Sequence, residues 1–504
     1  MDTMLQAAGS GLVQLLSPQT FLLMMISIVI GFIIGILPGI SAPTTLALML
    51  PFTFSMSPHA AFAFLLGMLS VSIMFGDVTS ILFGVPGEPL SASVILDGHP
   101  MAKQGQTGRA LGAVLMSSLV GSIIGAVALA ASIPIIRPVV LAFGSPEFFG
   151  LALVGILFIA VLSGGNATKG ILAGALGLML SMVGLDPQSG VQRYTFGQLE
   201  LWDGIKLVPV TVGLFGVGEL VDLWVKQTSI SERRIGKVGG VWQGCKDTFA
   251  HLGLTVRCSF LGIFLGIIPG LGGISQWLAY AHSVQSSKDK SQFGRGDVRG
   301  VIGPGATMNA KEGGNLITTV AFGVPSSVTM AILLGAFLIQ GLVPGPDMLT
   351  KNLDLTFSFV WLVIISHFIS VVLSFLLVNQ MVRITEIRSA LILPGIILLV
   401  LFGGFSEDNS FFSMYVTVIS GFVGMVMIWL DWPRPPLVLG LVLGGLIEKN
   451  LFISYSRYEF SFMLRPVLLG IMIVAVALLV LPHIQKRIAQ RWRVKEEYLA
   501  TQES

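Results

Sequence analysis

The sequence predicts an all-α polytopic membrane protein with about 12 hydrophobic segments in two inverted-topology repeats, each with broken helices or re-entrant hairpins. Composition, long apolar runs and duplicated Pro-Gly motifs lead to this fold class. Of 504 residues, 54% are hydrophobic and 11% are charged, and the mean hydropathy is +0.86. Soluble domains carry roughly 25% charged residues, so this chain could not cover a surface that faces water.

The long apolar runs predict membrane-spanning helices rather than barrel strands. Several approach the roughly 20 residues needed to cross a bilayer, and they do not alternate apolar with polar residues. The runs are Phe21–Leu37, Leu111–Ile136, Phe148–Leu162, Leu207–Gly218, Phe357–Val378, Ala390–Phe402 and Val467–Leu481. Phe21–Leu37 is expected to be the first membrane segment, because Met1–Thr20 lacks the basic region of a cleaved signal peptide.

Charge and motif content argue against several other classes. The net charge is only +3, and no concentrated basic face suggests nucleic acid as a partner. Cys245 and Cys258 form neither a metal-ligand set nor a disulfide framework. An enzyme is not expected, because neither His-Glu-x-x-His nor Gly-x-Ser-x-Gly occurs. No cofactor is expected, and Na⁺ is the one metal ion considered.

Two different motifs occur twice in the same order. Gly35-Ile-Leu-Pro-Gly39 recurs as Gly266-Ile-Ile-Pro-Gly270, 231 residues later. Phe83-Gly-Val-Pro-Gly87 recurs as Phe322-Gly-Val-Pro-Ser326, 239 residues later. One such motif in a membrane helix would be read as a simple kink. Two motifs in the same order at nearly the same separation indicate an internal duplication.

The charges of matching loops indicate that the two copies are inverted. The loop after the first Phe-Gly-Val-Pro motif carries Lys103 and Arg109, while its counterpart Gly341–Asp347 has no basic residue. The short connection Phe52–His59 has none either, but its longer counterpart Ser283–Gly300 has four. Short basic loops favour the cytoplasm, so matching loops are expected on opposite sides of the membrane.

These charges predict a multi-pass protein of the bacterial inner membrane with a periplasmic N-terminus and a cytoplasmic C-terminus. The expected organisation has four parts. They are a first inverted repeat at residues 1–227, a cytoplasmic linker at 228–250, a second inverted repeat at 251–484 and a cytoplasmic tail at 485–504.

Inverted repeats with broken segments in matching positions are typical of secondary transporters, whose sites lie near the bilayer midplane between the repeats. Each break can offer freed carbonyls to a cation and a half-helix N-terminus to an anion. The residues of the two Pro-Gly breaks are therefore candidates for ion coupling: Gly35, Pro38, Gly39, Gly266, Pro269 and Gly270.

Asp77 is the main candidate for ion or proton coupling. It lies within the apolar run Leu65–Val85, where an ionisable side chain is costly and by default functional. The structural alternative is a carboxylate that reaches a helix N-terminus or the neighbouring Thr79 hydroxyl. Glu88, beside the first Phe-Gly-Val-Pro motif, either lines the site or caps the half-helix that follows. Asp97 is expected to shape a turn.

Amide and hydroxyl side chains near the breaks complete the candidate site. Asn309 and Asn315 can offer an oxygen to Na⁺ and an N–H donor to a carboxylate, while Lys311 and Glu312 between them could simply pair. The hydroxyls either contact substrate or bond their own backbone. The residues expected to bind substrate are Ser41, Thr44, Thr45, Gly87, Glu88, Asn309, Asn315, Ser326 and Ser327, and Asn309 is also expected in ion coupling.

The residues around these breaks resemble the TctA family, the large membrane subunit of tripartite tricarboxylate transporters. The most specific string is Asp97-Gly-His-Pro-Met-Ala-Lys-Gln-Gly105, and the resemblance covers residues 20–350. The other matching segments are Gly35–Ser41, Leu50–Phe54, Thr79–Glu88, Arg109–Gly112, Gly266–Gly272, Phe293–Gly296 and Gly341–Pro346.

The resemblance implies a periplasmic, TctC-like binding protein that delivers a small organic di- or tricarboxylate, and a small TctB-like membrane subunit. It also implies uptake driven by a gradient of Na⁺ or H⁺ rather than by ATP. A homodimer is compatible with the sequence. The identity of the carboxylate, the choice of ion, and elevator against rocking motion stay open at this stage.

Two positions depart from the family pattern. Pro304-Gly-Ala-Thr-Met-Asn309 stands where the family usually has Pro-Glu-x-x-Asn-Asn, and Met74-Phe-Gly-Asp77 stands where it tends to have Tyr-Gly-Gly-Ser. A carboxylate is therefore missing at Gly305 and gained at Asp77. The alternatives are a TRAP-like large subunit, a stand-alone ion-coupled transporter, or a channel with broken hairpins.

Overall fold

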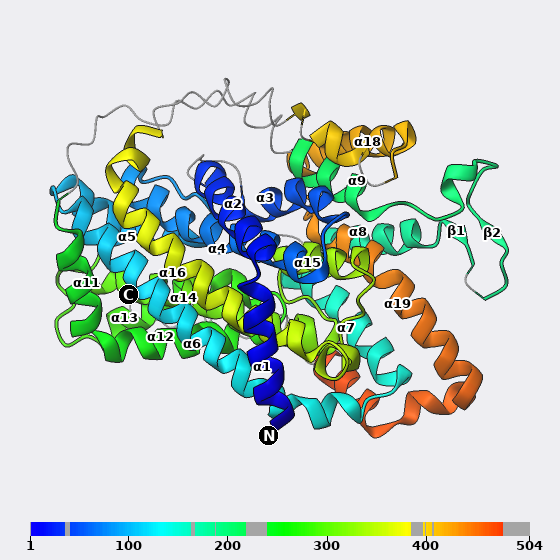
Figure 1. The fold of residues 1–504 in the computed structure, drawn as a ribbon. Helices are drawn as coiled ribbons and strands as arrows, with labels where there is room; N and C mark the ends of the chain where they lie inside the picture. The colour runs from blue at the N-terminus through cyan, green and yellow to red at the C-terminus, as the bar shows by residue number, and fades with distance from the viewer. Residues whose placement is uncertain are drawn as a thin grey trace, which may run out of the picture.

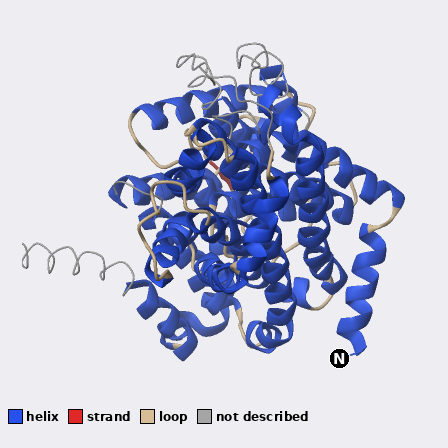
Figure 2. Cartoon of the chain, turned by 90° about the vertical axis from the view of Figure 1, so that its left-hand side faces the viewer, coloured by secondary structure: helices blue, strands red, loops and turns tan. Residues whose placement is uncertain are grey.

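The computed structural model describes residues 2–35, 41–162, 167–186, 188–217, 239–384, 397–398, 400–405 and 408–476. Within these residues the chain is almost wholly helical, as Figure 2 shows. Two short strands, β1 (Gly184–Leu185) and β2 (Gln192–Arg193), pair antiparallel and are the only strands there. The prediction of an all-α architecture is confirmed for this part of the chain.

The first half of the chain forms a series of long and short helices (Figure 1). They are α1 (Asp2–Leu15), α2 (Pro18–Gly35), α3 (Ala42–Met49), the 3-10 turn η1 (Leu50–Thr53), α4 (Pro58–Phe83), η2 (Pro89–Ser91), α5 (Ala92–Lys103), α6 (Thr107–Leu141), α7 (Ser145–Leu162), α8 (Ala167–Ser181), η3 (Leu199–Leu201), α9 (Leu207–Thr211) and the π-helical η4 (Val212–Val217).

The second half follows a similar alternation. Its elements are α11 (Val241–Ala250), α12 (Leu252–Ile267), η5 (Leu271–Ile274), α13 (Ser275–Ser286), α14 (Arg299–Phe322), α15 (Val328–Ile339), η6 (Pro346–Leu349), α16 (Leu353–Ile384), α18 (Phe411–Trp429), α19 (Pro435–Tyr458) and η7 (Glu459–Leu464). In Figure 1, α6 and α16 run side by side across the bundle, and the two helices are in contact.

Six helical segments among the described residues are long and apolar enough to cross a membrane. They are α2, α4, α6, Leu353–Val378 within α16, α18 and Pro435–Leu464. Helices α11 and α12, bent by 80° at their junction, form a seventh span if they are counted together. Shorter apolar helices such as α3, α8 and α15 lie between them, and the figure of about 12 segments stays a prediction.

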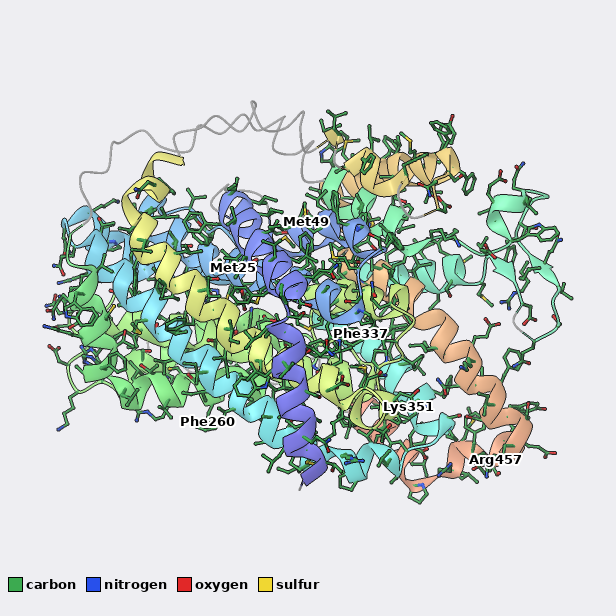
Figure 3. The ribbon with its side chains drawn as sticks, in the orientation of Figure 1. Met25, Met49, Phe260, Phe337, Lys351 and Arg457 are labelled. Carbon is green, nitrogen blue, oxygen red and sulfur yellow. The ribbon has the colours of Figure 1, made fainter. Side chains whose placement is uncertain are left out.

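Apolar side chains on the outer helix faces match a lipid environment. On α2, Leu22, Ile26, Val29 and Ile33 are all at least 43% exposed, and their spacing places them on one stripe. In Figure 3, Phe260 of α12 projects from the outer edge of the bundle, whereas Phe337 of α15 lies inside it. Extended apolar surface of this kind is unfavourable in water and marks a membrane-facing side.

Helices α4 and α14 are the most deeply buried elements. Every residue from 60 to 82 and from 300 to 321 is buried. Small residues allow this, because Gly121 on α6 faces the backbone of Ala306 and Gly266 on α12 faces the backbone of Lys311, with no space for a Cβ. Close backbone approach through small residues is the usual way in which helices pack in membranes.

The two halves share geometric details at the offsets found in the sequence. Both α4 and α14 end at a left-handed glycine, Gly84 with φ 67° and Gly323 with φ 66°. A Cβ on Gly31 of α2 would lie 2.7 Å from the carbonyl oxygen of Met68 on α4. A Cβ on Gly262 of α12 would lie 2.7 Å from the carbonyl oxygen of Thr307 on α14.

Helix α1 is an element that the sequence interpretation did not predict. It packs along α16, where the Trp361 indole N–H donates to the carbonyl oxygen of Ala8 at 2.9 Å. The described end of the proposed linker is also helical, because it forms α11, which packs against α6. Nε of Arg109 on α6 pairs with Oδ2 of Asp247 on α11 at 2.5 Å. Pro38, Gly39, residues 228–238 of the linker and the tail at 485–504 lie outside the described residues.

Candidate functional site

The first break follows Gly35, the last residue of α2. A Cβ on Gly35 would lie 3.1 Å from the Cα of Ser72 on α4, so this glycine serves close packing. After the undescribed residues the chain resumes at Ser41, which caps α3 by accepting the Thr44 N–H at 3.4 Å. Ala42, the first residue of α3, donates its N–H to Oε1 of Glu88 at 3.0 Å.

The second break interrupts the chain between α12 and η5. Ile268 is extended and Gly270 is left-handed with φ 79°, a conformation that glycine adopts without strain, and Pro269 lies between them. The Gly270 N–H donates to the carbonyl oxygen of Ser326 at 2.9 Å. The tip of each half therefore bonds to a neighbouring segment of the same half, through Glu88 to the N-terminus of α3 in the first half and through Ser326 to Gly270 of the break in the second.

The first tip has no spare space around its glycine. A Cβ on Gly87 would collide with Oγ1 of Thr79 and with the backbone of Gly76. Glu88 caps the short helix η2, together with Ser91, in addition to its bond with Ala42. The structure therefore shows the alternative role of Glu88, the capping of the helix that follows it. Its carboxylate also lies at the N-terminus of α3, where the helix dipole favours an anion.

Asp77 and Gln276 form a buried polar contact between the two halves. Asp77 on α4 is 1% exposed, and Gln276 Nε2 on α13 donates to its Oδ1 at 2.9 Å and to its Oδ2 at 3.1 Å. The same Nε2 lies 3.4 Å from the carbonyl oxygen of Pro304 on α14. Gln276 Oε1 is buried and has no hydrogen-bond partner among the described residues.

Gln276 was missed by the sequence interpretation. A glutamine in a short helix carries no periodic signal, and no motif marks it. One signal was present, because Gln276 follows Thr45 by 231 residues, the spacing of the two Pro-Gly breaks. Thr45 itself bonds to the carbonyl oxygen of Ser41 at 3.1 Å, so it has the backbone role that was the alternative to substrate contact.

A second polar chain links α14 to its hairpin tip. Asn315 Nδ2 donates to Oε2 of Glu312 at 3.1 Å, and Ser326 Oγ donates to Oδ1 of Asn315 at 2.8 Å. Lys311 lies 3.8 Å from Oε1 of Glu312. Two predicted site residues, Asn315 and Ser326, are thus in direct contact, while Ser327 caps α15 by accepting the Met330 N–H at 3.2 Å.

Asn309 belongs to a different face of α14. Its Nδ2 donates to Oγ of Ser118 on α6, and its Oδ1 is buried without a partner among the described residues. Gly305 faces α6 as well, where a Cβ would lie 2.6 Å from Oγ of Ser117. Asp77 contacts α13 instead, so it does not occupy the position that a side chain at Gly305 would take.

A third contact joins the halves away from the breaks. Asp97 on α5 is fully buried, and its Oδ1 accepts the N–H groups of Gly296 and Asp297, both at 2.9 Å. Its Oδ2 accepts the Tyr280 hydroxyl at 2.9 Å. Asp97 therefore fixes the loop before α14, which is a larger role than the local turn expected from the sequence.

The described residues contain no cluster of three or more His, Cys, Asp or Glu side chains suited to a metal ion. A single carboxylate or amide oxygen is also an acceptor that a monovalent cation can use. Asp77 and the unpaired Oε1 of Gln276 are groups of that kind.

Six long apolar helices in the described part of the chain, packed with buried polar contacts between the two halves, define a multi-pass membrane protein. The sequence model of the family described as "Tripartite tricarboxylate transporter TctA family" matches residues 21–439. The chain belongs to this family, which confirms the resemblance found in its motifs.

Two proteins from Agrobacterium vitis are similar to the chain. One is described as an uncharacterized 52.8 kDa protein in the TAR-I ttuC′ 3′ region, and it is 32% identical over 481 residues, 94% of this chain and 95% of that protein. The other is described as an uncharacterized protein in the TAR-II ttuC′ 3′ region, 32% identical over 233 residues, 45% of this chain and 96% of that protein. No solved structure matches the chain.

Proposed function

We propose that the chain is the large transmembrane subunit of a binding-protein-dependent secondary transporter that imports a small organic di- or tricarboxylate. A gradient of Na⁺ or H⁺ would drive uptake in the bacterial inner membrane. Membership of the TctA family supports this function, since the family belongs to tripartite tricarboxylate transporters. A TctB-like small membrane subunit and a TctC-like periplasmic binding protein would complete the complex.

The observation that carries the proposal is the hydrogen-bonded pair of Asp77 and Gln276. A carboxylate buried inside a membrane helix is costly and marks an ion or proton pathway by default. This carboxylate bridges α4 and α13, so a proton or Na⁺ that arrives there changes the contact between the two halves. Ion binding and the relative position of the halves are then linked.

We infer that the two halves are inverted repeats, at residues 1–227 and 251–484, with a cytoplasmic linker at 228–250 and a cytoplasmic tail at 485–504. The equivalent packing of Gly31 on Met68 and Gly262 on Thr307 supports the duplication. The same order of elements supports it too, from α2 to α6 and from α12 to α16. The opposed loop charges favour a periplasmic N-terminus.

Alternating access would move the two hairpin tips relative to the helices that surround them. Glu88 bonds the first tip to the N-terminus of α3, and Ser326 bonds the second tip to Gly270 of its break. We propose an elevator motion, in which each tip moves as a unit with the segment to which it is bonded.

Reconstituted vesicles provide the test. The chain is purified with its small membrane subunit, inserted into proteoliposomes, and given the binding protein with radiolabelled citrate or another di- or tricarboxylate. An imposed Na⁺ or H⁺ gradient is expected to drive accumulation above the outside concentration, without ATP. A channel would only equilibrate the substrate. A stand-alone transporter would accumulate it at the same rate when the binding protein is left out.

A further inference from the structure

Lys311 carries a buried ammonium group whose hydrogen-bond donors find no acceptor in the rest of α14. Its side chain is 7% exposed, and no hydrogen bond leaves its Nζ among the described residues. An ammonium group has three donors. A charge removed from water without hydrogen bonds lowers stability, so such groups are normally paired and fully bonded.

Glu312 does not accept a hydrogen bond from the Lys311 ammonium group. Their separation of 3.8 Å exceeds the 2.7–3.2 Å of a hydrogen bond between nitrogen and oxygen. The reason is geometric, because consecutive residues of an α-helix point about 100° apart and do not face each other. Glu312 is moreover engaged with Asn315, which donates to its other carboxylate oxygen at 3.1 Å.

The position of Lys311 connects the elements of the candidate site. Its backbone packs against Gly266 in the last turn of α12, immediately before the second break. Its charge interacts with that of Asp77 on α4. One helical turn further on, Asn315 contacts Ser326 at the hairpin tip. Lys311 thus lies on the turn of α14 that packs against the end of α12, one turn before the residue that contacts the second tip.

We propose that Lys311 binds a carboxylate group of the transported substrate. The proposal rests on the proposed function, and it identifies the residue that would distinguish a carboxylate from a neutral group. A carboxylate is the chemical partner that supplies strong acceptors to an ammonium. Asn315 lies one helical turn after Lys311 and is in contact with Ser326, and the polar groups of these two residues could bind further oxygens of the same substrate.

The charges around Lys311 also link substrate to ion. Asp77, Glu312 and Lys311 are all buried, and their formal charges sum to one negative charge when all three groups are ionised. A substrate carboxylate adds another negative charge in a region of low dielectric constant. Its binding is therefore favoured when a cation or proton binds at Asp77, and the cation is favoured by the substrate in return.

The first experiment measures binding of radiolabelled citrate, succinate and malate to the purified full chain in nanodiscs, with Lys311→Gln beside the wild type. For the substrate that the wild type binds, Lys311→Gln is expected to weaken binding by about tenfold or more, because a charge-assisted hydrogen bond is lost. The preference of the wild type for that substrate over its monoamide should shrink in the same variant. Unchanged affinity and unchanged preference would overturn the proposal.

A double variant distinguishes substrate binding from structural pairing. Lys311→Gln alone leaves Glu312 buried without compensation, which could weaken binding through folding. Lys311→Gln with Glu312→Gln removes both charges. If Lys311 only compensated Glu312, the double variant would regain the affinity of the wild type, and the proposal would be wrong. If Lys311 binds substrate, the double variant stays weak while Glu312→Gln alone keeps its affinity.

Gradient-driven uptake separates this proposal from the proposed function. Accumulation by the wild type, together with normal binding by the double variant, overturns only the role of Lys311. If the wild type neither binds nor accumulates any of the di- and tricarboxylates under a Na⁺ or H⁺ gradient, the proposed function fails and the role of Lys311 fails with it.

Discussion

Gln276 donates its side-chain N–H group to both carboxylate oxygens of Asp77, at 2.9 and 3.1 Å, and thereby joins α13 to α4. The two residues come from different halves of the chain, 199 positions apart. Because the contact is buried and connects the segments that follow the second break and precede the first tip, a change in either partner affects both halves.

Replacement of Asp77 by Asn is expected to abolish the use of the ion gradient. An amide cannot take up a proton near neutral pH and has one oxygen rather than two, so it cannot replace an ionised carboxylate. Accumulation in proteoliposomes under an imposed Na⁺ or H⁺ gradient should fall at least about tenfold, while equilibrium binding of substrate persists. Asp77→Glu is the control that keeps the charge. Full accumulation by Asp77→Asn would show that Asp77 has no coupling role.

Replacement of Gln276 by Leu should lower stability by about 1.5–3 kcal/mol, since the buried carboxylate of Asp77 loses the donor that it shares between its two oxygens. Thermal unfolding of the purified protein in detergent measures the effect. Gln243→Leu is a matched control, because Gln243 also donates to an aspartate, Asp247, at 3.1 Å.

In that control Asp247 keeps its ion pair with Arg109 at 2.5 Å, and the site is only partly buried. Its expected loss is below about 1 kcal/mol. If Gln276→Leu and Gln243→Leu destabilise the protein equally, the contact between Gln276 and Asp77 contributes no more to stability than the partly buried contact between Gln243 and Asp247.

The two left-handed glycines that end α4 and α14 provide a comparison within one chain. Alanine at Gly323, with φ 66°, should lower the free energy of unfolding by about 1–2 kcal/mol, because its backbone is left-handed. No steric clash adds to this loss, since the nearest atom would be 3.5 Å from the new Cβ. Alanine at Gly84, with φ 67°, should cost more, since its Cβ would also lie 2.9 Å from the His99 ring. The unfolding temperatures should therefore rank wild type, Gly323→Ala, then Gly84→Ala. The reverse order would contradict the tight contact with His99.

Features that depend on composition and on backbone chemistry could be predicted from the sequence. Apolar runs located the long helices, and the Pro-Gly motif located the break at Gly270, because proline and glycine end helices in a predictable way. Asp77 could be selected because a carboxylate in an apolar run is rare in itself.

Side-chain partners could not be predicted in the same way, since they depend on the phase of each helix. Asn309 and Lys311 are two residues apart and therefore point about 200° apart, so Asn309 reaches α6 while Lys311 points to another side of α14. Gln276 meets Asp77 only through the tertiary arrangement of α13. Helix α1 escaped prediction because it is held by α16, which is far away in the sequence.

Replacement of Asp97 by Ala should release the loop that precedes α14. Three hydrogen bonds end on this buried carboxylate, from Gly296, Asp297 and the Tyr280 hydroxyl, and all of them would be lost. Trypsin should then cleave in the loop at Lys288, Lys290 or Arg295 markedly faster than in the wild type, as judged by gel electrophoresis and mass spectrometry of the fragments. Asp289→Ala is the control, because Asp289 lies in the same loop and its carboxylate accepts hydrogen bonds from its neighbour Ser291 and, among the described residues, from none in the first half. If both variants are cut at the rate of the wild type, Asp97 is not what holds the loop against α5, and the contact between the halves at this place must rest on packing instead.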